Sequence, residues 1–147
     1  MESLYYATVP SRFGKLGIVW TRGGVSPKIV RILLPRGSVP METVLGDSCV
    51  KGSFLSCAAV AQVGDQIREY LEGEPVRFEL NLLALKNCSE FQRKVLMADY
   101  GIPRGWVSTY GRIASNLGCP GCARAVGNAL ARNPFPIIIP CHRVLRS

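Results

Sequence analysis

Two helical patterns separated by a glycine-rich turn constrain the fold of this chain more than any other feature. In the segment STYGRIASNLG, residues 108–118, four residues share one helical face: Tyr110, Ile113, Ala114 and Leu117. Gly118, Pro120 and Gly121 then require a turn. A second helical stretch, CARAVGNALARN, follows at residues 122–133. The segment therefore predicts a helix-turn-helix.

The second of these helices is made mostly of small residues. Its alanines and glycine are Ala123, Ala125, Gly127, Ala129 and Ala131, and its charges are Arg124 and Arg132. Such a helix can approach a groove of nucleic acid closely without reading many bases, since base contacts need Arg, Asn or Gln at several positions. The alternative is tight packing inside the protein. An arginine in a first helical turn is not favoured by the helix dipole, so Arg124 indicates an external partner or a solvated surface residue.

The rest of the chain predicts an α+β fold. Residues 4–9, 15–20 and 28–34 are short β-rich runs, typical of a small antiparallel sheet. Residues 35–53 show no clear period and are expected to form a loop. Helical periodicity starts at Ala59, and Gly73 ends this helix. Residues 76–80 predict a strand. Ser89 and Gln92, at capping-box spacing, predict a further helix that stops at Gly101. We expect a linker near 81–88, and hence an N-terminal domain at 1–85 and a C-terminal domain at 86–147.

Composition narrows the class of partner. The chain has 147 residues, of which 48% are hydrophobic, and a formal charge of +8. This charge suits a polyanion, and nucleic acid is one candidate. The sequence has neither an apolar run of about 20 residues nor the charged start and apolar core of a signal peptide. We therefore expect a soluble intracellular protein that does not bind membranes.

The six cysteines are expected to be reduced, because nothing in the sequence directs export. They are Cys49, Cys57, Cys88, Cys119, Cys122 and Cys141. The motif CPGC, residues 119–122, fits half a metal site, a redox pair or incidental turn residues. A tetrahedral zinc site needs two further ligands, and the sequence offers one histidine and no second C-x-x-C. We favour incidental turn residues and expect neither a metal nor a cofactor.

The stretch IIIPCHRV, residues 137–144, sets Cys141 beside the only histidine, His142. We expect the isoleucines to form a strand that ends at Pro140, so that the thiol faces a cleft. A nearby imidazole and Arg143 would lower the thiol pKa and make it nucleophilic. The alternative is a buried, inert cysteine.

Several motifs in order resemble one family. The segments EFQRKVL, IPRGWVSTYGRIA, RAVGNALARNPFPIII and PCHRV, from about Phe91 to Val144, resemble the methylated-DNA–protein-cysteine methyltransferases, the O-6-alkylguanine-DNA alkyltransferases. The resemblance implies a ribonuclease H-like sheet domain followed by a helical domain whose helix-turn-helix enters the minor groove. It implies, as partner, double-stranded DNA containing O-6-alkylguanine, bound by a single chain in the cytoplasm, nucleoid or nucleus without a cofactor.

The same resemblance assigns roles to individual residues. Cys141 would accept the alkyl group in a single, suicidal turnover, His142 would activate it through a water, and Asn133 would be the hinge next to the recognition helix. Arg124 would enter the base stack and Tyr110 would help to flip the nucleotide, with Ala123 and Gly127 at the DNA surface.

One departure from the family pattern is visible. No acidic residue follows Cys141, so the glutamate that completes the family's Cys, His, water and Glu chain has no counterpart here. Either the usual C-terminal tail of the family is missing through truncation, or another carboxylate or another chain replaces the glutamate. A protein that binds alkylated DNA without repairing it is therefore the alternative, although such relatives usually lack the acceptor cysteine. A cysteine hydrolase is disfavoured, because its nucleophile and base rarely adjoin in sequence.

Overall fold

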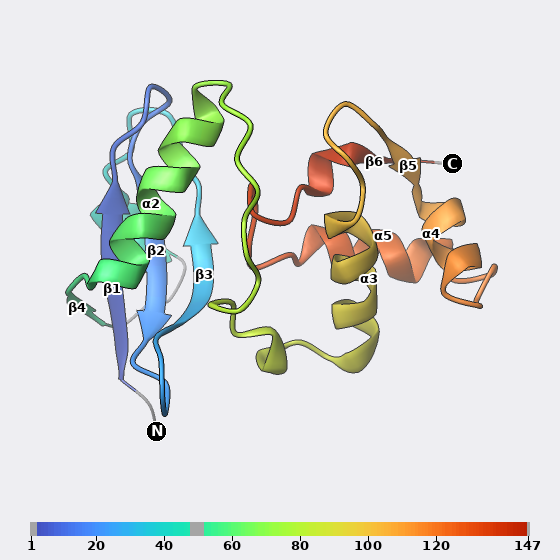
Figure 1. Ribbon diagram of the computed structural model, residues 1–147, viewed down its shortest axis with the longest axis horizontal. Coiled ribbons are helices and arrows are strands. Elements are labelled where there is room, and N and C mark those ends of the chain that lie inside the picture. The colour runs from blue at the N-terminus through green and yellow to red at the C-terminus, as the bar shows by residue number, and fades with distance from the viewer. Residues whose placement is uncertain (1–2, 48–51, 147) are drawn as a thin grey trace. The chain divides into compact units, whose positions relative to one another are not determined.

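The computed structural model describes residues 3–47 and 52–146 (Figure 1). The chain divides into two compact units, Met1–Ala84 and Leu85–Ser147. The first unit is built on a sheet and the second on helices, so the predicted α+β class is confirmed. Within the described ranges, no helix combines the length and apolar character that crossing a membrane requires.

The first unit contains a four-stranded sheet with the order β3-β2-β1-β4. Its strands are β1 (Leu4–Val9), β2 (Leu16–Thr21), β3 (Lys28–Leu33) and β4 (Ser53–Phe54). The pairs β1–β2 and β2–β3 are antiparallel, as predicted, and β4 adds a short parallel pairing to β1. The three strand predictions are confirmed to within a residue or two at each end.

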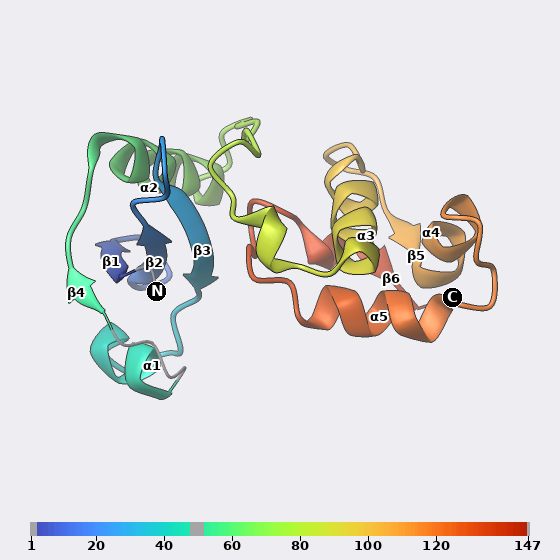
Figure 2. The ribbon, with the colours of Figure 1, turned by 90° about the horizontal axis from the view of Figure 1, so that it is seen from below.

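Helices α1 (Met41–Asp47) and α2 (Ala58–Leu71) lie on opposite faces of this sheet (Figure 2). Every residue of β2 is buried, because the strand is covered on both faces. Helix α2 turns Val60, Val63 and Ile67 inward, as its period predicted. It also approaches the sheet closely at Gly64, where a Cβ atom would lie 2.8 Å from Cγ2 of Val9.

Two predictions for this unit are wrong. Helix α1 lies in the segment 35–53 that was expected to be a loop, and its Met41, Val44 and Leu45 pack against Val19 and Leu33. Seven residues are two turns, too few for a clear period in sequence. Residues 48–51 of that segment, including Cys49, lie outside the described residues.

The second wrong prediction is the strand at 76–80. These residues form no ladder, and the sheet edge is instead bridged by Leu83, opposite Ile29. Phe78 is buried with its ring centroid 5.7 Å from that of Tyr70. The alternation of apolar residues in VRFEL therefore reflects the packing of Phe78 against α2 and not the pairing of a strand.

The second unit packs three helices together, with a short 3-10 helix before them. The elements are η1 (Leu85–Asn87), α3 (Glu90–Tyr100), β5 (Ser108–Thr109), α4 (Tyr110–Asn116), α5 (Ala123–Ala131), η2 (Cys141–Arg143) and β6 (Val144–Leu145). Ser89 caps α3 by accepting a hydrogen bond from the Gln92 N–H, as predicted. The Gln92 side chain does not complete the capping box, because it donates to the carbonyls of Ala129 and Arg132 at the end of α5.

The isoleucine run before Cys141 is not a strand, so that prediction is also wrong. Residues 136–139 form turns, and Ile137 has a φ of 75°, in the left-handed region that β-branched residues rarely adopt. Ile138 and Ile139 are buried. Their side chains therefore serve the core while the backbone folds back on itself, and the extended pairing begins later, where β6 joins β5 in parallel.

Candidate active site

Cys141 begins the 3-10 turn η2 and is half-buried. Its N–H donates to the Ile139 carbonyl at 3.0 Å, and the Arg143 N–H donates to the Pro140 carbonyl at 3.0 Å. Val144 of β6 then pairs with Ser108 of β5. The sulfur atom is thus carried by a short, hydrogen-bonded turn that is fixed at both ends.

Asn133 holds the chain that leads into this turn. Its Nδ2 donates to the Ile139 carbonyl at 2.8 Å, and its Oδ1 accepts from the Phe135 N–H at 2.8 Å. Its side chain also hydrogen-bonds to the Cys141 sulfur, which lowers the pKa of that thiol. One side chain therefore ties together the end of α5, the isoleucine turn and the cysteine, a geometry that suits the hinge expected from the resemblance.

The net pKa of the Cys141 thiol is raised, so the expectation of a lowered pKa is wrong. Burial is the main cause, the negative charge of Asp99 adds to it, and the hydrogen bond from Asn133 only partly opposes it. The neighbouring imidazole and Arg143 are visible in the sequence, whereas the burial of the thiol and the nearby carboxylate are not. At rest, the sulfur is a protonated thiol.

His142 is exposed and adjoins the thiol along the chain. Burial of part of the ring and the charge of Arg143 lower its pKa, so the imidazole is neutral near pH 7 and can accept a proton. In the part of the chain that the structure describes, no direct hydrogen bond joins His142 to Cys141.

Asp99 is the residue near this site that the sequence reasoning missed. It lies on α3 and is fully buried, at 0% exposure. Burial raises its pKa to about 6, and the charge of Arg143 partly opposes this. A signal was present in the sequence, because Val95, Leu96 and Asp99 follow helical spacing on one buried face.

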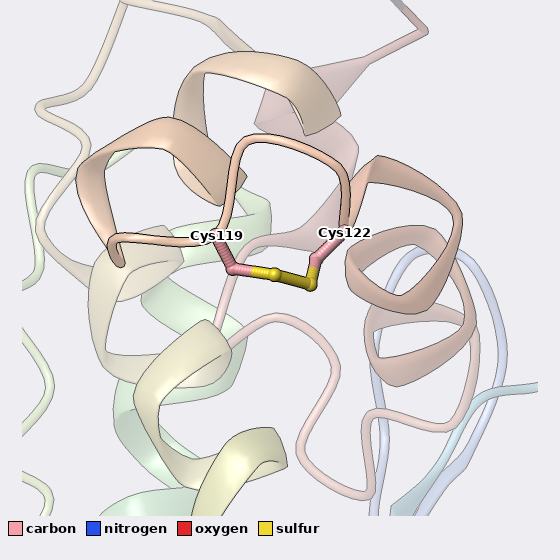
Figure 3. The surroundings of a disulfide bond; sticks show 2 residues. All are labelled: Cys119 and Cys122. Carbon is pink, nitrogen blue, oxygen red and sulfur yellow. A yellow bond between two sulfur atoms is a disulfide. The ribbon is translucent and has the colours of Figure 1, made fainter.

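The predicted helix-turn-helix is present as α4 and α5. Gly118, with a φ of 81°, makes the turn that the sequence required. The expectation that CPGC is an incidental, reduced pair is wrong, because a disulfide joins Cys119 to Cys122 (Figure 3). The turn brings their Cα atoms within 5.4 Å, in the range a disulfide spans. Among the described residues, no group of three or more His, Cys, Asp or Glu side chains is placed to hold a metal ion.

The residues expected at the DNA surface separate into two sets. Arg124 is exposed in the first turn of α5, and Ala125 and Asn128 share its exposed face. Ala123 and Gly127 are half-buried. A Cβ atom on Gly127 would lie 3.1 Å from the Tyr110 ring, so this glycine also permits packing of α5 on α4. Tight packing inside the protein, the alternative that the sequence left open for this helix, thus explains Gly127. It does not explain Arg124, which is exposed.

Comparison with known proteins places this site in a family. The model of the 6-O-methylguanine DNA methyltransferase DNA-binding domain matches residues 90–147. A methylated-DNA–protein-cysteine methyltransferase of Methanosarcina acetivorans is 46% identical over 142 residues, which cover 97% of this chain and 83% of that protein. The chain belongs to the methylated-DNA–protein-cysteine methyltransferase family.

Two other methyltransferases extend the comparison. The protein of Methanothermobacter thermautotrophicus is 39% identical over 132 residues, which cover 90% of this chain but 66% of that one. A crystal structure of the Mycobacterium tuberculosis protein in complex with DNA is 30% identical with a TM-score of 0.71, covering 97% of this chain and 79% of that one. The sequence alignments with several mycobacterial methyltransferases cover about half of those proteins, and 55% to 59% of this chain.

Proposed function

We propose that this protein repairs DNA directly, by moving an alkyl group from O-6 of guanine onto its own Cys141. One observation carries the proposal: the half-buried Cys141 thiol is fixed by the hydrogen bonds of Asn133 and of the η2 turn, next to a neutral His142. Membership of the methyltransferase family supports the same reaction.

The reaction needs a proton acceptor, because the resting thiol is protonated. His142 takes the proton, and the thiolate attacks the alkyl carbon as the bond from that carbon to O-6 breaks. A carbon–sulfur bond forms, and the guanine leaves with its oxygen and takes up a proton. The product is a thioether, which has no carbonyl for water to attack, so each protein molecule reacts once.

DNA binding is assigned to the second unit. Residues 85–147 hold nine Lys and Arg and two Asp and Glu, a formal charge of +7, whereas residues 1–84 hold nine and eight. Helix α5 presents Arg124 among small residues, which suits close approach to the minor groove with little base reading. In this proposal Arg124 takes the place of the flipped nucleotide, and Tyr110 assists the flip. The relative from Mycobacterium tuberculosis that was crystallised with DNA supports this assignment.

The test is the mass of the intact protein after incubation with a duplex oligonucleotide that carries O-6-methylguanine. We expect the mass to rise by one methyl group in place of a proton, and the modified peptide to contain Cys141. The Cys141→Ser variant should bind the oligonucleotide and gain no mass.

Binding without a mass gain in the unmodified chain would contradict transfer and would assign the protein to the class that marks alkylated DNA. A methyl group found on Cys57 or Cys88 would contradict the role of Cys141, because those thiols are the other free cysteines among the described residues.

A further inference from the structure

Three local effects disfavour an aspartate at position 99. The side chain is fully buried, and neither carboxylate oxygen has a hydrogen-bond partner among the described residues. A buried carboxylate in that state is costly to desolvate. It also lies at the second-last residue of α3, where the helix dipole disfavours negative charge. A leucine would fit the apolar face of α3 better, so local stability does not explain this residue.

Arg143 connects Asp99 to η2, the turn of Cys141–Arg143 that carries the thiol and is called the acceptor turn below. It is the last residue of η2, two positions after Cys141. Its Nη1 donates to the Ile102 carbonyl at 2.9 Å, just beyond α3, and the Ile102 N–H donates to the Asp99 carbonyl at 3.0 Å. The guanidinium is thus fixed at the end of α3, where its charge acts on the Asp99 carboxylate.

We propose that Asp99 is a positioning residue for the reaction of Cys141: its buried carboxylate attracts the Arg143 guanidinium, which the Ile102 carbonyl binds at the end of α3, and this attraction keeps the turn that carries the thiol in place. The proposal rests on the proposed function, since it assigns Asp99 a part in the same reaction. It predicts two opposite effects of the carboxylate. The charge opposes ionisation of the thiol, while the connection through Arg143 keeps the sulfur in its place.

Few other charges bear on this pair. The charge of Arg143 acts on the pKa of Asp99, whereas the charge of Asp99 and the hydrogen bond from Asn133 act on the pKa of Cys141. The neighbouring His142 is neutral near pH 7. The remaining cations on the packed helices that are exposed, Lys94, Arg112 and Arg124, are not among the causes that shift either pKa. A change at Asp99 should therefore be read directly in the ionisation of Cys141.

The experiment compares the full chain with Asp99→Asn, which keeps the shape and removes the charge, and with Asp99→Glu, which keeps the charge. Asp65→Asn is the matched control, because Asp65 is an exposed carboxylate of the first unit paired with Arg68. Three quantities are measured: the pH profile of Cys141 alkylation by iodoacetamide, hydrogen exchange of the peptide spanning 141–143, and methyl transfer from the lesion oligonucleotide.

For Asp99→Asn we expect the alkylation profile to move to lower pH, with a rate at pH 7 that rises about twofold or more as the thiolate fraction grows. Hydrogen exchange in the turn should become faster, and methyl transfer should become slower. Asp99→Glu should stay closer to the unmodified chain, and Asp65→Asn should match it.

Two results would overturn the proposal. An unshifted alkylation profile would mean that Asp99 does not act on the thiol, and faster transfer with unchanged hydrogen exchange would mean that it acts by charge alone. If the unmodified chain transfers no methyl group, the proposed function fails, while alkylation and hydrogen exchange still decide the role of Asp99. If Asp99→Asn does not fold, Asp99→Leu removes the same charge and suits the apolar surroundings.

Discussion

The two units follow different rules for what they bury. In the first unit the core is apolar, and Thr21 is its one buried polar residue among those described. In the second unit the carboxylate of Asp99 is fully buried, and the Asn133 side chain hydrogen-bonds to the Cys141 sulfur and to the backbone before it. The first unit is close to neutral, whereas the second carries a formal charge of +7. Features that local stability disfavours, such as a buried carboxylate without a hydrogen bond among the described residues, therefore occur in the unit to which the chemistry is assigned.

The sharpest test of this contrast is a matched pair of core truncations, Ile18→Ala in β2 and Ile139→Ala beside the acceptor turn. Both side chains are fully buried, so each change should lower the free energy of unfolding by about 2–5 kcal/mol. Urea denaturation measures this. Only Ile139→Ala should alter the alkylation rate of Cys141 in the folded protein, because the buried Ile139 side chain anchors the backbone whose carbonyl accepts from Asn133 and Cys141. Equal effects on the thiol would remove the distinction between the units.

The second test uses pH. Folding raises the pKa of Asp99 from 3.8 to about 6. The folded chain therefore holds this proton more tightly, and Asp99 ceases to be neutral as the pH rises through the folded pKa. Its contribution to the free energy of unfolding should fall between about pH 4 and pH 6 and stay low above that, by roughly 3 kcal/mol. In Asp99→Leu, the free energy of unfolding measured by denaturation should lack this fall. If the unmodified chain and Asp99→Leu show the same dependence on pH, Asp99 is not a buried ionisable group.

The contrast was only partly visible in the sequence. Strands β1 to β3, α2 and the helix-turn-helix were predicted, because period and turn residues are local properties. Helix α1 was missed because it is short, and 76–80 and 137–139 were misassigned because their apolar residues pack as side chains without pairing as strands.

At the site, the segments PCHRV and RAVGNALARNPFPIII and their resemblance to one family indicated Cys141, His142 and Asn133 as candidates, whose roles remain predictions. The raised thiol pKa and the influence of Asp99 could not be predicted, since they depend on contacts between segments 42 residues apart in sequence.

Asn133→Ala tests the hydrogen bonds that distinguish the second unit. The change removes two hydrogen bonds to the backbone, each worth about 1 kcal/mol, and leaves the Ile139 carbonyl with one donor fewer. We expect a loss of about 2 kcal/mol in the free energy of unfolding. The Cys141 alkylation profile should move to higher pH, because a hydrogen bond that lowers the thiol pKa is lost. A profile that moves the other way would contradict the contact.

Arg124→Ala should have the smallest effect on stability, because the side chain is exposed. We expect transfer from a duplex oligonucleotide to slow by about tenfold, as for the loss of one specific arginine contact to DNA. Reaction with free O-6-benzylguanine should be unchanged, since no base has to be flipped. Arg68→Ala in the first unit serves as the control for charge. Equal losses on both substrates would contradict the role given to Arg124.

The pairing of β5 with β6 has a further consequence. Thr109 caps α4 by accepting from the Arg112 N–H, and in the same short sheet Thr109 lies opposite Leu145 and Ser108 opposite Val144. The start of the helix-turn-helix and the residues after the η2 turn are therefore joined by main-chain atoms, which every amino acid except proline can supply. The side chains of Ser108 and Leu145 can therefore vary during evolution without separating the helix-turn-helix from the turn that carries Cys141. Insertion of one residue after Arg143 would instead change the register and turn every following side chain to the opposite face.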